Sequence, residues 1–92
     1  MAYKLKPRGY QKISAATLAA ATALTVPTAA NRALIVAAAA GVAWRDDGTD
    51  PTATDGVPIS SGGSMLYDGD LSAIKFILIS GSPILHVAYY EE

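Results

Sequence analysis

Residues 33–39, 72–80 and 84–90 are rich in apolar and β-branched residues, and in a β-strand their alternate positions would lie on opposite faces. One set of alternate positions comprises Leu34, Val36 and Ala38, then Ile74, Phe76 and Leu78, then Leu85, Val87 and Tyr89. In residues 72–80 the second set, Lys75, Ile77 and Ile79, is also largely apolar. That stretch is therefore expected to be a central strand, or to turn its second face toward a neighbouring subunit.

Turn signals separate these stretches. Asp-Gly occurs at 47–48, 55–56 and 68–69, Gly-Gly at 62–63, and proline at 51, 58 and 83. Short strands with such frequent turns indicate a sandwich or a barrel. We expect an all-β fold, a small antiparallel β-sandwich or jelly-roll-like barrel. Residues 10–92 would form this single domain, and residues 1–9 an extended N-terminal arm that is ordered only when a partner holds it.

Two hairpins follow from this interpretation. The first joins strands at Ala33–Ala39 and Val42–Asp46 through a turn at Ala40-Gly41, and the second joins 72–80 to 84–90 through the turn at 80–83. A helix over the alanine run is competitive on propensity alone, but the run stops at Gly41. Residues 13–26 fit irregular strands.

The N-terminal third also imitates a secretory signal, because a basic start precedes an apolar segment and the small residues of "PTAAN". Thr17, Thr22 and Thr25 interrupt that segment, which argues against a signal. A small secreted β-protein processed near Ala30 stays an alternative. The longer apolar stretch 13–44 is broken by Pro27 and Asn31-Arg32, so we expect neither a membrane span nor a membrane partner.

Composition favours association over charge-driven binding. Of the 92 residues, only 16 % are charged and 51 % are hydrophobic, so a monomer would have few charged side chains to hydrate its surface. The net charge of −1 provides no field for nucleic acid. The early cations Lys4, Lys6, Arg8 and Lys12 suggest an arm that docks on a partner. The absence of cysteine excludes disulfides and thiol catalysis.

The densest polar cluster is "RDDGTDPT" at 45–52. It could hold calcium, but it lacks the alternating ligands and terminal glutamate of an EF-hand. We instead expect Arg45, Asp46 and Asp47 to structure the loop, with no metal, cofactor or catalytic residue. His86, the one histidine, is expected to be packed or in an interface. An alternative use of the aromatic residues is a sugar-stacking surface made by Trp44, Tyr67, Tyr89 and Tyr90.

Several turn and strand motifs occur in a fixed order. "ALTVPTAANRALIVA" precedes "AWRDDG" and a Pro-Thr loop, and a Gly-rich turn, "DLSAIKFI" and the terminal "VAYY" follow. Over about residues 22–90 this order resembles the small β-sandwich structural proteins of tailed-bacteriophage virions, of the capsid decoration (cement), head-fibre or tail-tip type. The alanine run at 37–40 departs from that pattern, in which a charged or Gly-rich turn is expected.

The resemblance implies a non-enzymatic role. The protein would be a capsid decoration protein that binds the major capsid protein on the outer head shell as a symmetric homo-oligomer, with a trimer favoured. It would be made in the host cytoplasm and located at the capsid surface of the virion. The residues expected at partner interfaces are Tyr3, Lys4, Lys6, Arg8, Tyr89 and Tyr90. The alternative is a carbohydrate- or receptor-binding module of a tail tip or fibre, using the loop at 46–56.

Overall fold

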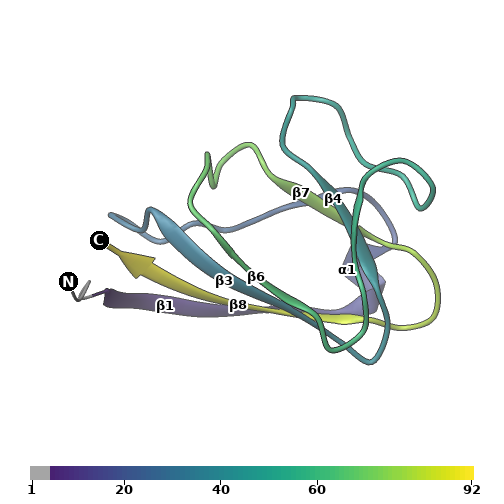
Figure 1. The fold of residues 1–92 in the computed structure, drawn as a ribbon, viewed down its shortest axis with the longest axis horizontal. Coiled ribbons are helices and arrows are strands. Elements are labelled where there is room, and N and C mark those ends of the chain that lie inside the picture. Colours follow the sequence, from purple (N-terminus) through teal and green to yellow (C-terminus); the bar gives the residue numbers. More distant parts are fainter. Residues whose placement is uncertain (1–4) are drawn as a thin grey trace.

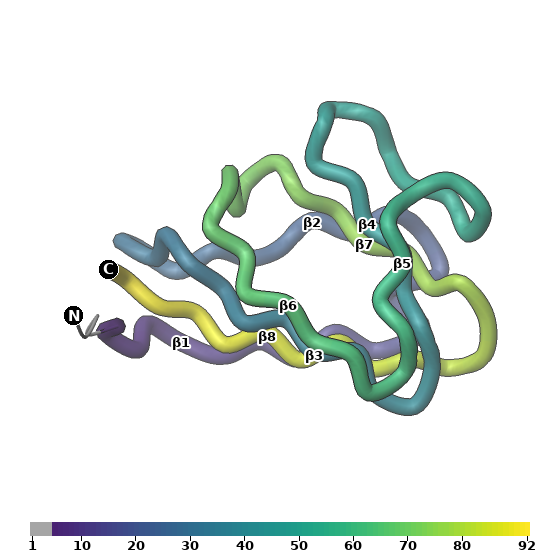
Figure 2. Tube along the Cα trace, in the orientation of Figure 1, coloured from purple at the N-terminus to yellow at the C-terminus, as the bar shows by residue number. Residues whose placement is uncertain are grey.

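Two four-stranded antiparallel sheets make up the protein, which confirms the all-β sandwich (Figures 1 and 2). The computed structural model describes residues 5–92. In order across the first sheet lie β1 (Lys6–Ile13), β8 (Ile84–Glu91), β3 (Arg32–Ala38) and β6 (Ser64–Tyr67). In order across the second lie β2 (Thr22–Ala23), β7 (Lys75–Leu78), β4 (Val42–Arg45) and β5 (Val57–Ile59). A single short helix in the described residues, α1 (Ala15–Leu18), connects β1 to β2.

The core fills the space between the sheets with alternate side chains of the strands. In β8 the positions predicted to share a face, Leu85, Val87 and Tyr89, are all at most 1 % exposed. Phe76 of β7 and Leu18 of α1 are completely buried beside them. In β3 the buried residues are Ala33, Ile35 and Ala37, so the opposite set, which contains Leu34, lies on the outside of the first sheet.

The two predicted hairpins are wrong, although their strands exist. β3 pairs with β8 and β6, whereas β4 pairs with β7 and β5, so residues 39–41 cross from one sheet to the other. The connection from β7 to β8 crosses between the sheets in the same way. A strand with one buried face has the same period-two pattern whether its chain neighbour pairs with it or lies in the facing sheet. The sequence pattern therefore does not distinguish the two arrangements.

The N-terminal region also differs from its prediction. Residues 6–9 are not a separate arm, because they begin β1, which pairs with β8 along its whole length. A β-bulge lies between Pro7 and Gly9. Tyr3 and Lys4, also predicted to belong to the arm, lie outside the described residues. Residues 13–26, predicted as irregular strands, contain the end of β1, the helix α1 and the two-residue strand β2.

The alanine run ends in a strained turn. Ala39 has a φ of 69°, in the left-handed region that costs an L-residue with a Cβ about 1–2 kcal/mol. We expect Ala39→Gly to raise the free energy of unfolding by about 0.5–1 kcal/mol, since glycine relieves this strain at some entropic cost in the unfolded chain. Urea unfolding measures the change. The matched control, Ala38→Gly within β3, should destabilise the fold, and a loss of stability in Ala39→Gly would contradict the turn geometry.

Candidate functional site

The outer face of the first sheet is exposed and largely apolar. Residues opposite one another on paired strands share a face, so the register defines its rows. The central row runs across the sheet as Tyr10, Ala88, Leu34 and Leu66. Tyr10 is 61 % exposed and Leu66 57 %, and they lie on the two edge strands. The first sheet therefore presents large hydrophobic side chains to solvent where a monomer would gain from polar ones.

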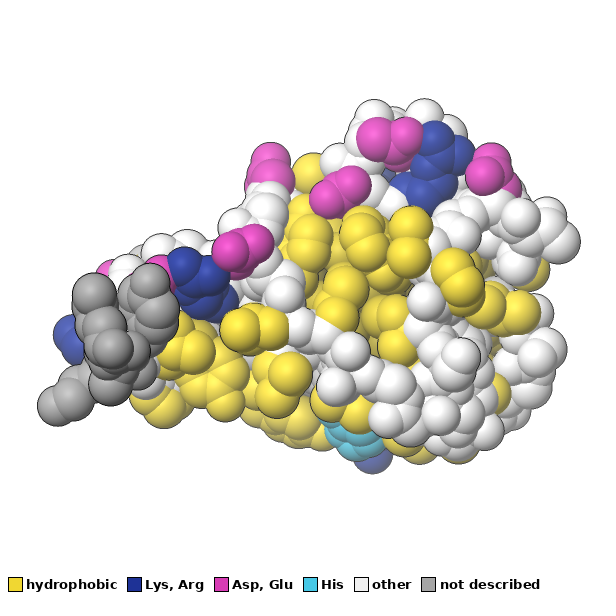
Figure 3. All heavy atoms as spheres, in the orientation of Figure 1, with side chains coloured by type: hydrophobic (Ala, Val, Ile, Leu, Met, Phe, Trp, Pro, Cys, Tyr) yellow, Lys and Arg dark blue, Asp and Glu magenta, His cyan; other side chains and the backbone are white. Residues whose placement is uncertain are grey.

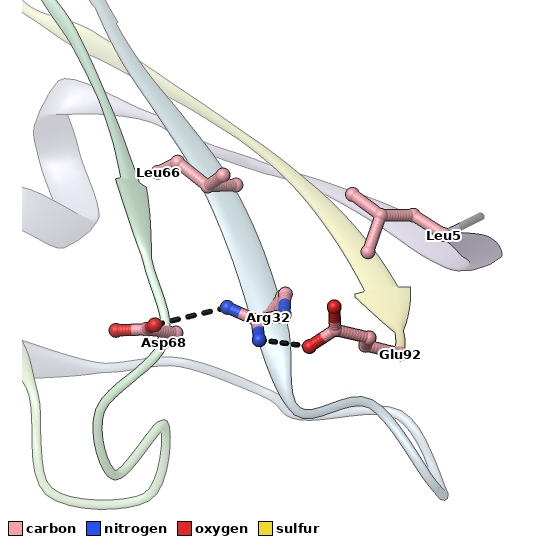
Figure 4. Close-up of a pocket in the computed structure, with 5 residues that line it drawn as sticks. All are labelled: Leu5, Arg32, Leu66, Asp68 and Glu92. Carbon is pink, nitrogen blue, oxygen red and sulfur yellow. Dashed lines mark hydrogen bonds and ion pairs between the residues drawn. The ribbon is translucent and has the colours of Figure 1, made fainter. Parts of the chain in front are cut away.

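A shallow hollow of about 350 Å³ lies on this face beside the central row (Figure 4). Leu5 and Leu66 line it from opposite edges of the sheet, and Arg32 of β3 lies between them. Arg32 donates hydrogen bonds to Asp68 Oδ2, at 2.9 Å, and to Glu92. These bonds, first that to Glu92, raise the pKa of Arg32. The hollow thus has apolar sides, and the charge of Arg32 at its base is neutralised by Asp68 and Glu92 of the same chain.

The opposite end of the face carries a row of Lys12, His86, Val36 and Ser64. The Tyr10 hydroxyl and His86 Nδ1 are hydrogen-bonded at 2.6 Å, and the two rings stack with their centroids 6.1 Å apart. His86 consequently lies on the outer face among partly exposed neighbours, outside the core.

A second candidate region is the loop at 46–56 that follows β4. Arg45 Nε donates to Asp47 Oδ1 at 3.0 Å, and Arg45 Nη1 donates to Asp55 Oδ2 at 3.1 Å. One guanidinium therefore holds the beginning and the end of the loop together. The hydrogen bonds from Arg45 also lower the pKa of Asp47 below its usual value. Because these groups are solvent-exposed, the pairs order the loop more than they stabilise the fold.

Two further contacts fasten this loop to both sheets. The hydroxyl of Tyr67, on β6 of the first sheet, donates to Asp46 Oδ2 at 2.6 Å, and Lys75 Nζ lies 2.9 Å from Asp50 Oδ1. Burial, followed by the bond to Asp46, raises the pKa of Tyr67 to about 12. Gly69 leaves room for this tyrosine, since a Cβ there would lie 2.5 Å from the Tyr67 hydroxyl oxygen.

We expect Tyr67→Phe to loosen the loop. Loss of the bond to Asp46 should cost about 1 kcal/mol, because the acceptor is charged but partly solvated. Hydrogen–deuterium exchange at 46–56 should become faster while the strands keep their protection. Ser72→Ala is a matched control, because it removes a hydroxyl that bonds only Asp70 on another loop. Unchanged exchange in Tyr67→Phe would show that this bond does not order the loop.

A hollow of about 340 Å³ adjoins the loop and is lined by Trp44, Arg45, Asp46, Asp47, Asp55, Gly56 and Val57. It lies on the edge of the sandwich formed by β5. In Figure 3 hydrophobic side chains reach the surface between β6 and the strands β4 and β5, with acidic and basic groups gathered on the loop above them. Trp44 and Tyr67 meet edge-on there, with ring centroids 6.0 Å apart.

The predicted interface residues do not form one surface. Tyr89 is 1 % exposed and donates to Gln11 Oε1 at 2.6 Å, so its prediction as a partner contact is corrected to a core role. Tyr90 lies on the outer face, opposite Arg32, and Lys6 and Arg8 lie on the exposed edge strand β1. The alternative of a sugar-stacking surface made by all four aromatic residues is also wrong, because Tyr89 is buried in the core and Tyr90 lies on the opposite face of β8. Trp44 and Tyr67 do meet, and both pack partly against the core.

Sequence reasoning missed Tyr10, Leu34 and Leu66 as surface residues. Leu34 stood in a stretch in which both faces are apolar, so the sequence carried no signal that Leu34 lies outside and Ile35 inside. Tyr10 was assigned to no strand, because the arm was expected to end at Gly9 and the first strands were expected only from residue 13 onward.

Among residues 5–92, no three His, Asp or Glu side chains gather as metal ligands, and no helix has the length and apolar character needed to cross a bilayer. Comparison of the chain with protein-family models, with curated proteins and with solved structures gave no match.

Proposed function

We propose that the protein is a non-enzymatic structural component of a bacteriophage virion, a capsid decoration protein. It binds the major capsid protein on the outer head shell as a symmetric oligomer and stabilises the shell. The observation that carries this proposal is the exposed apolar outer face of the first sheet, with Tyr10 and Leu66 more than half exposed. Such a face suits a protein that works in an assembly. The order of turn and strand motifs over residues 22–90 supports the virion setting.

We assign contact with the major capsid protein to the N-terminal segment, through Tyr3, Lys4 and Lys6. Lys6 begins β1, which is an edge strand of the sandwich and so is open on one side. Each contact would be weak by itself. Repetition around a symmetric oligomer on a regular lattice raises the overall affinity through effective concentration.

Capsid occupancy tests this assignment, with purified capsids that lack the protein. The truncation should remove only residues 2–4, because a longer one would remove β1 from its pairing with β8. This truncation and Lys6→Glu should each lower the apparent affinity about tenfold. Ser61→Glu, which adds a carboxylate at an exposed position of the turn between β5 and β6, is the control, because Ser61 belongs neither to the N-terminal segment nor to the outer-face rows. Full occupancy by both N-terminal variants would contradict the role of this segment.

The hollow beside the loop favours a second candidate function, recognition of a carbohydrate by a tail-tip or fibre module. An aromatic residue beside fixed carboxylates and a guanidinium is a common sugar-binding combination, and Trp44, Asp55 and Arg45 line this hollow together. A glycan array tests it with the wild-type chain and with Trp44→Leu, whose thermal unfolding must show a folded protein. Binding that Trp44→Leu abolishes would support the module, and silence across the array would favour the decoration protein.

A further inference from the structure

We infer that the outer face of the first sheet binds the same face of a second copy of this chain, around a two-fold axis that runs parallel to the strands. This inference rests on the proposed function only for the claim that the chain works as an oligomer. It names the interface and the partner, and it predicts a dimer contact in place of the trimer that the sequence favoured.

The central row is complementary to itself under that symmetry. An axis along the strands, midway between β8 and β3, places β1 over β6 of the second copy and β8 over β3. Tyr10 then faces Leu66, and Leu34 faces the small Ala88, each contact occurring twice. The two most exposed large side chains of the face thus cover each other, and large residues meet small ones at its centre.

The charges of the face are few, and most are paired within one copy. Arg32 donates to Asp68 and Glu92, and Arg8, at the β1 edge, is paired with Glu91. Lys6 lies opposite Glu91, on the face of β8 that carries the buried Tyr89, so Lys12 is the β1 cation that the register places on the outer face. An axis perpendicular to the strands would instead place the two β1 strands over each other, and Tyr10 would no longer cover Leu66.

Polar residues within the face also find suitable partners. The rows place Tyr90 opposite Arg32 of the second copy, where a guanidinium can lie over the ring. In the row on the other side of the central row, His86 faces Val36 of the second copy, and Lys12 faces Ser64. No two like charges oppose each other in these rows.

The area is sufficient for a weak specific dimer. The four strands contain 8, 8, 7 and 4 residues. At about 3.3 Å per residue and about 4.8 Å between strands, they cover roughly 430 Å². Two such faces bury roughly 900 Å², which is the size of weak, transient interfaces. We therefore expect a dissociation constant on the order of 10–100 μM.

Sedimentation equilibrium of the full chain, without capsids, tests the inference over protein concentrations of about 10–500 μM. Because no capsid is present, failure of the chain to dimerise in this experiment is distinct from failure to bind a capsid. The wild-type chain should approach twice its mass of 9.5 kDa. A chain that stays monomeric over this range, or that forms trimers, overturns the inference.

A charge exchange tests the register. Tyr10→Glu and Leu66→Lys should each weaken the dimer at least about tenfold, because each places an unpaired charge in the interface. The double variant should regain most of the affinity, since the carboxylate introduced on β1 then faces the ammonium group introduced on β6 of the second copy. Within one chain these positions lie on opposite edges of the sheet and cannot pair. Val57→Lys is the matched control, because Val57 is 49 % exposed on the second sheet.

A cross-link gives an independent readout if a charged variant fails to fold. The chain has no cysteine, so Tyr10→Cys together with Leu66→Cys introduces the only two thiols. Under mild oxidation this double-cysteine variant should form a covalent dimer whose two bridges resist dilution. A double charge variant that is no better than the single charge variants, together with a double-cysteine variant that yields no such dimer, overturns the two-fold register.

Discussion

Replacing Phe76 by alanine is expected to cost about 3–5 kcal/mol of unfolding free energy. Phe76 is completely buried in β7, the strand between β2 and β4, where it lies opposite Thr22 and Trp44. No other phenylalanine exists in the chain, and the core cluster around it is mostly leucine and isoleucine, whose close packing lets neighbours relax only partly into the space. A domain of this length has about 5–14 kcal/mol of stability, and the variant should lose a large part of it.

Urea denaturation at neutral pH, followed by tryptophan fluorescence, measures this loss, since Trp44 lies beside Phe76. Val57→Ala is the matched control because Val57 is 49 % exposed on the second sheet, and a surface truncation usually changes stability by less than about 0.5 kcal/mol. A cost of less than about 1 kcal/mol in Phe76→Ala would mean that β7 does not close the core as described.

Stability should fall steeply in alkali because of Tyr89. Burial raises the pKa of Tyr89 to about 12 from the usual 10.0. The folded protein therefore holds the tyrosine proton more tightly than the unfolded chain does. The stabilisation is complete below pH 10 and is lost as the pH rises from about 10 to about 12. The difference between the two pKa values corresponds to at most about 2.7 kcal/mol, and solvent at the end of the sheet reduces this to about 2 kcal/mol.

Urea denaturation repeated between pH 9 and pH 12 checks this expectation. Tyr89→Phe removes the ionising hydroxyl, so about half of the pH dependence should disappear in this variant, because the pKa of Tyr67 is also raised to about 12 and Tyr67 keeps its share. Tyr90→Phe, which changes the neighbouring tyrosine on the outer face, is the matched control. The account of the core fails if Tyr89→Phe keeps the wild-type slope.

The strands themselves were predictable because burial imposes alternation. In β8 the alternation correctly grouped Leu85, Val87 and Tyr89 on one face, but only the structure shows that this face is the buried one. In β7 both faces are apolar, so the sequence grouped Phe76 with Ile74 and Leu78 without showing which face is inside. Turn residues such as those at 62–63 also separated the strands correctly.

Strand pairing was not predictable, because turn chemistry is local and pairing is not. The sequence at 39–41 reads as a tight turn, yet β3 and β4 lie in different sheets. The arm was misplaced for a related reason. Pro7 and Gly9 look like breakers, but an edge strand tolerates proline and a bulge, as β1 does here.

The candidate sites, too, were predictable only where their contacts are local in the sequence. Arg45, Asp46 and Asp47 were expected to structure their own loop, and Arg45 does bond Asp47, whereas the bond from Tyr67 to Asp46 depends on the packing of two sheets. The outer face of the first sheet could not be derived at all, since Leu34 and Ile35 are equally apolar and only the fold decides which one is buried.

The most direct test of the central claim is to locate the protein in a phage particle that carries it, by electron cryomicroscopy of purified virions with mass spectrometry of their proteins. The proposed function predicts sandwich density on the outer head shell, with the β1 edge toward the major capsid protein and outer sheet faces paired around two-fold axes. Absence of the chain from purified virions, or its location only at the tail, would contradict the assignment as a capsid decoration protein.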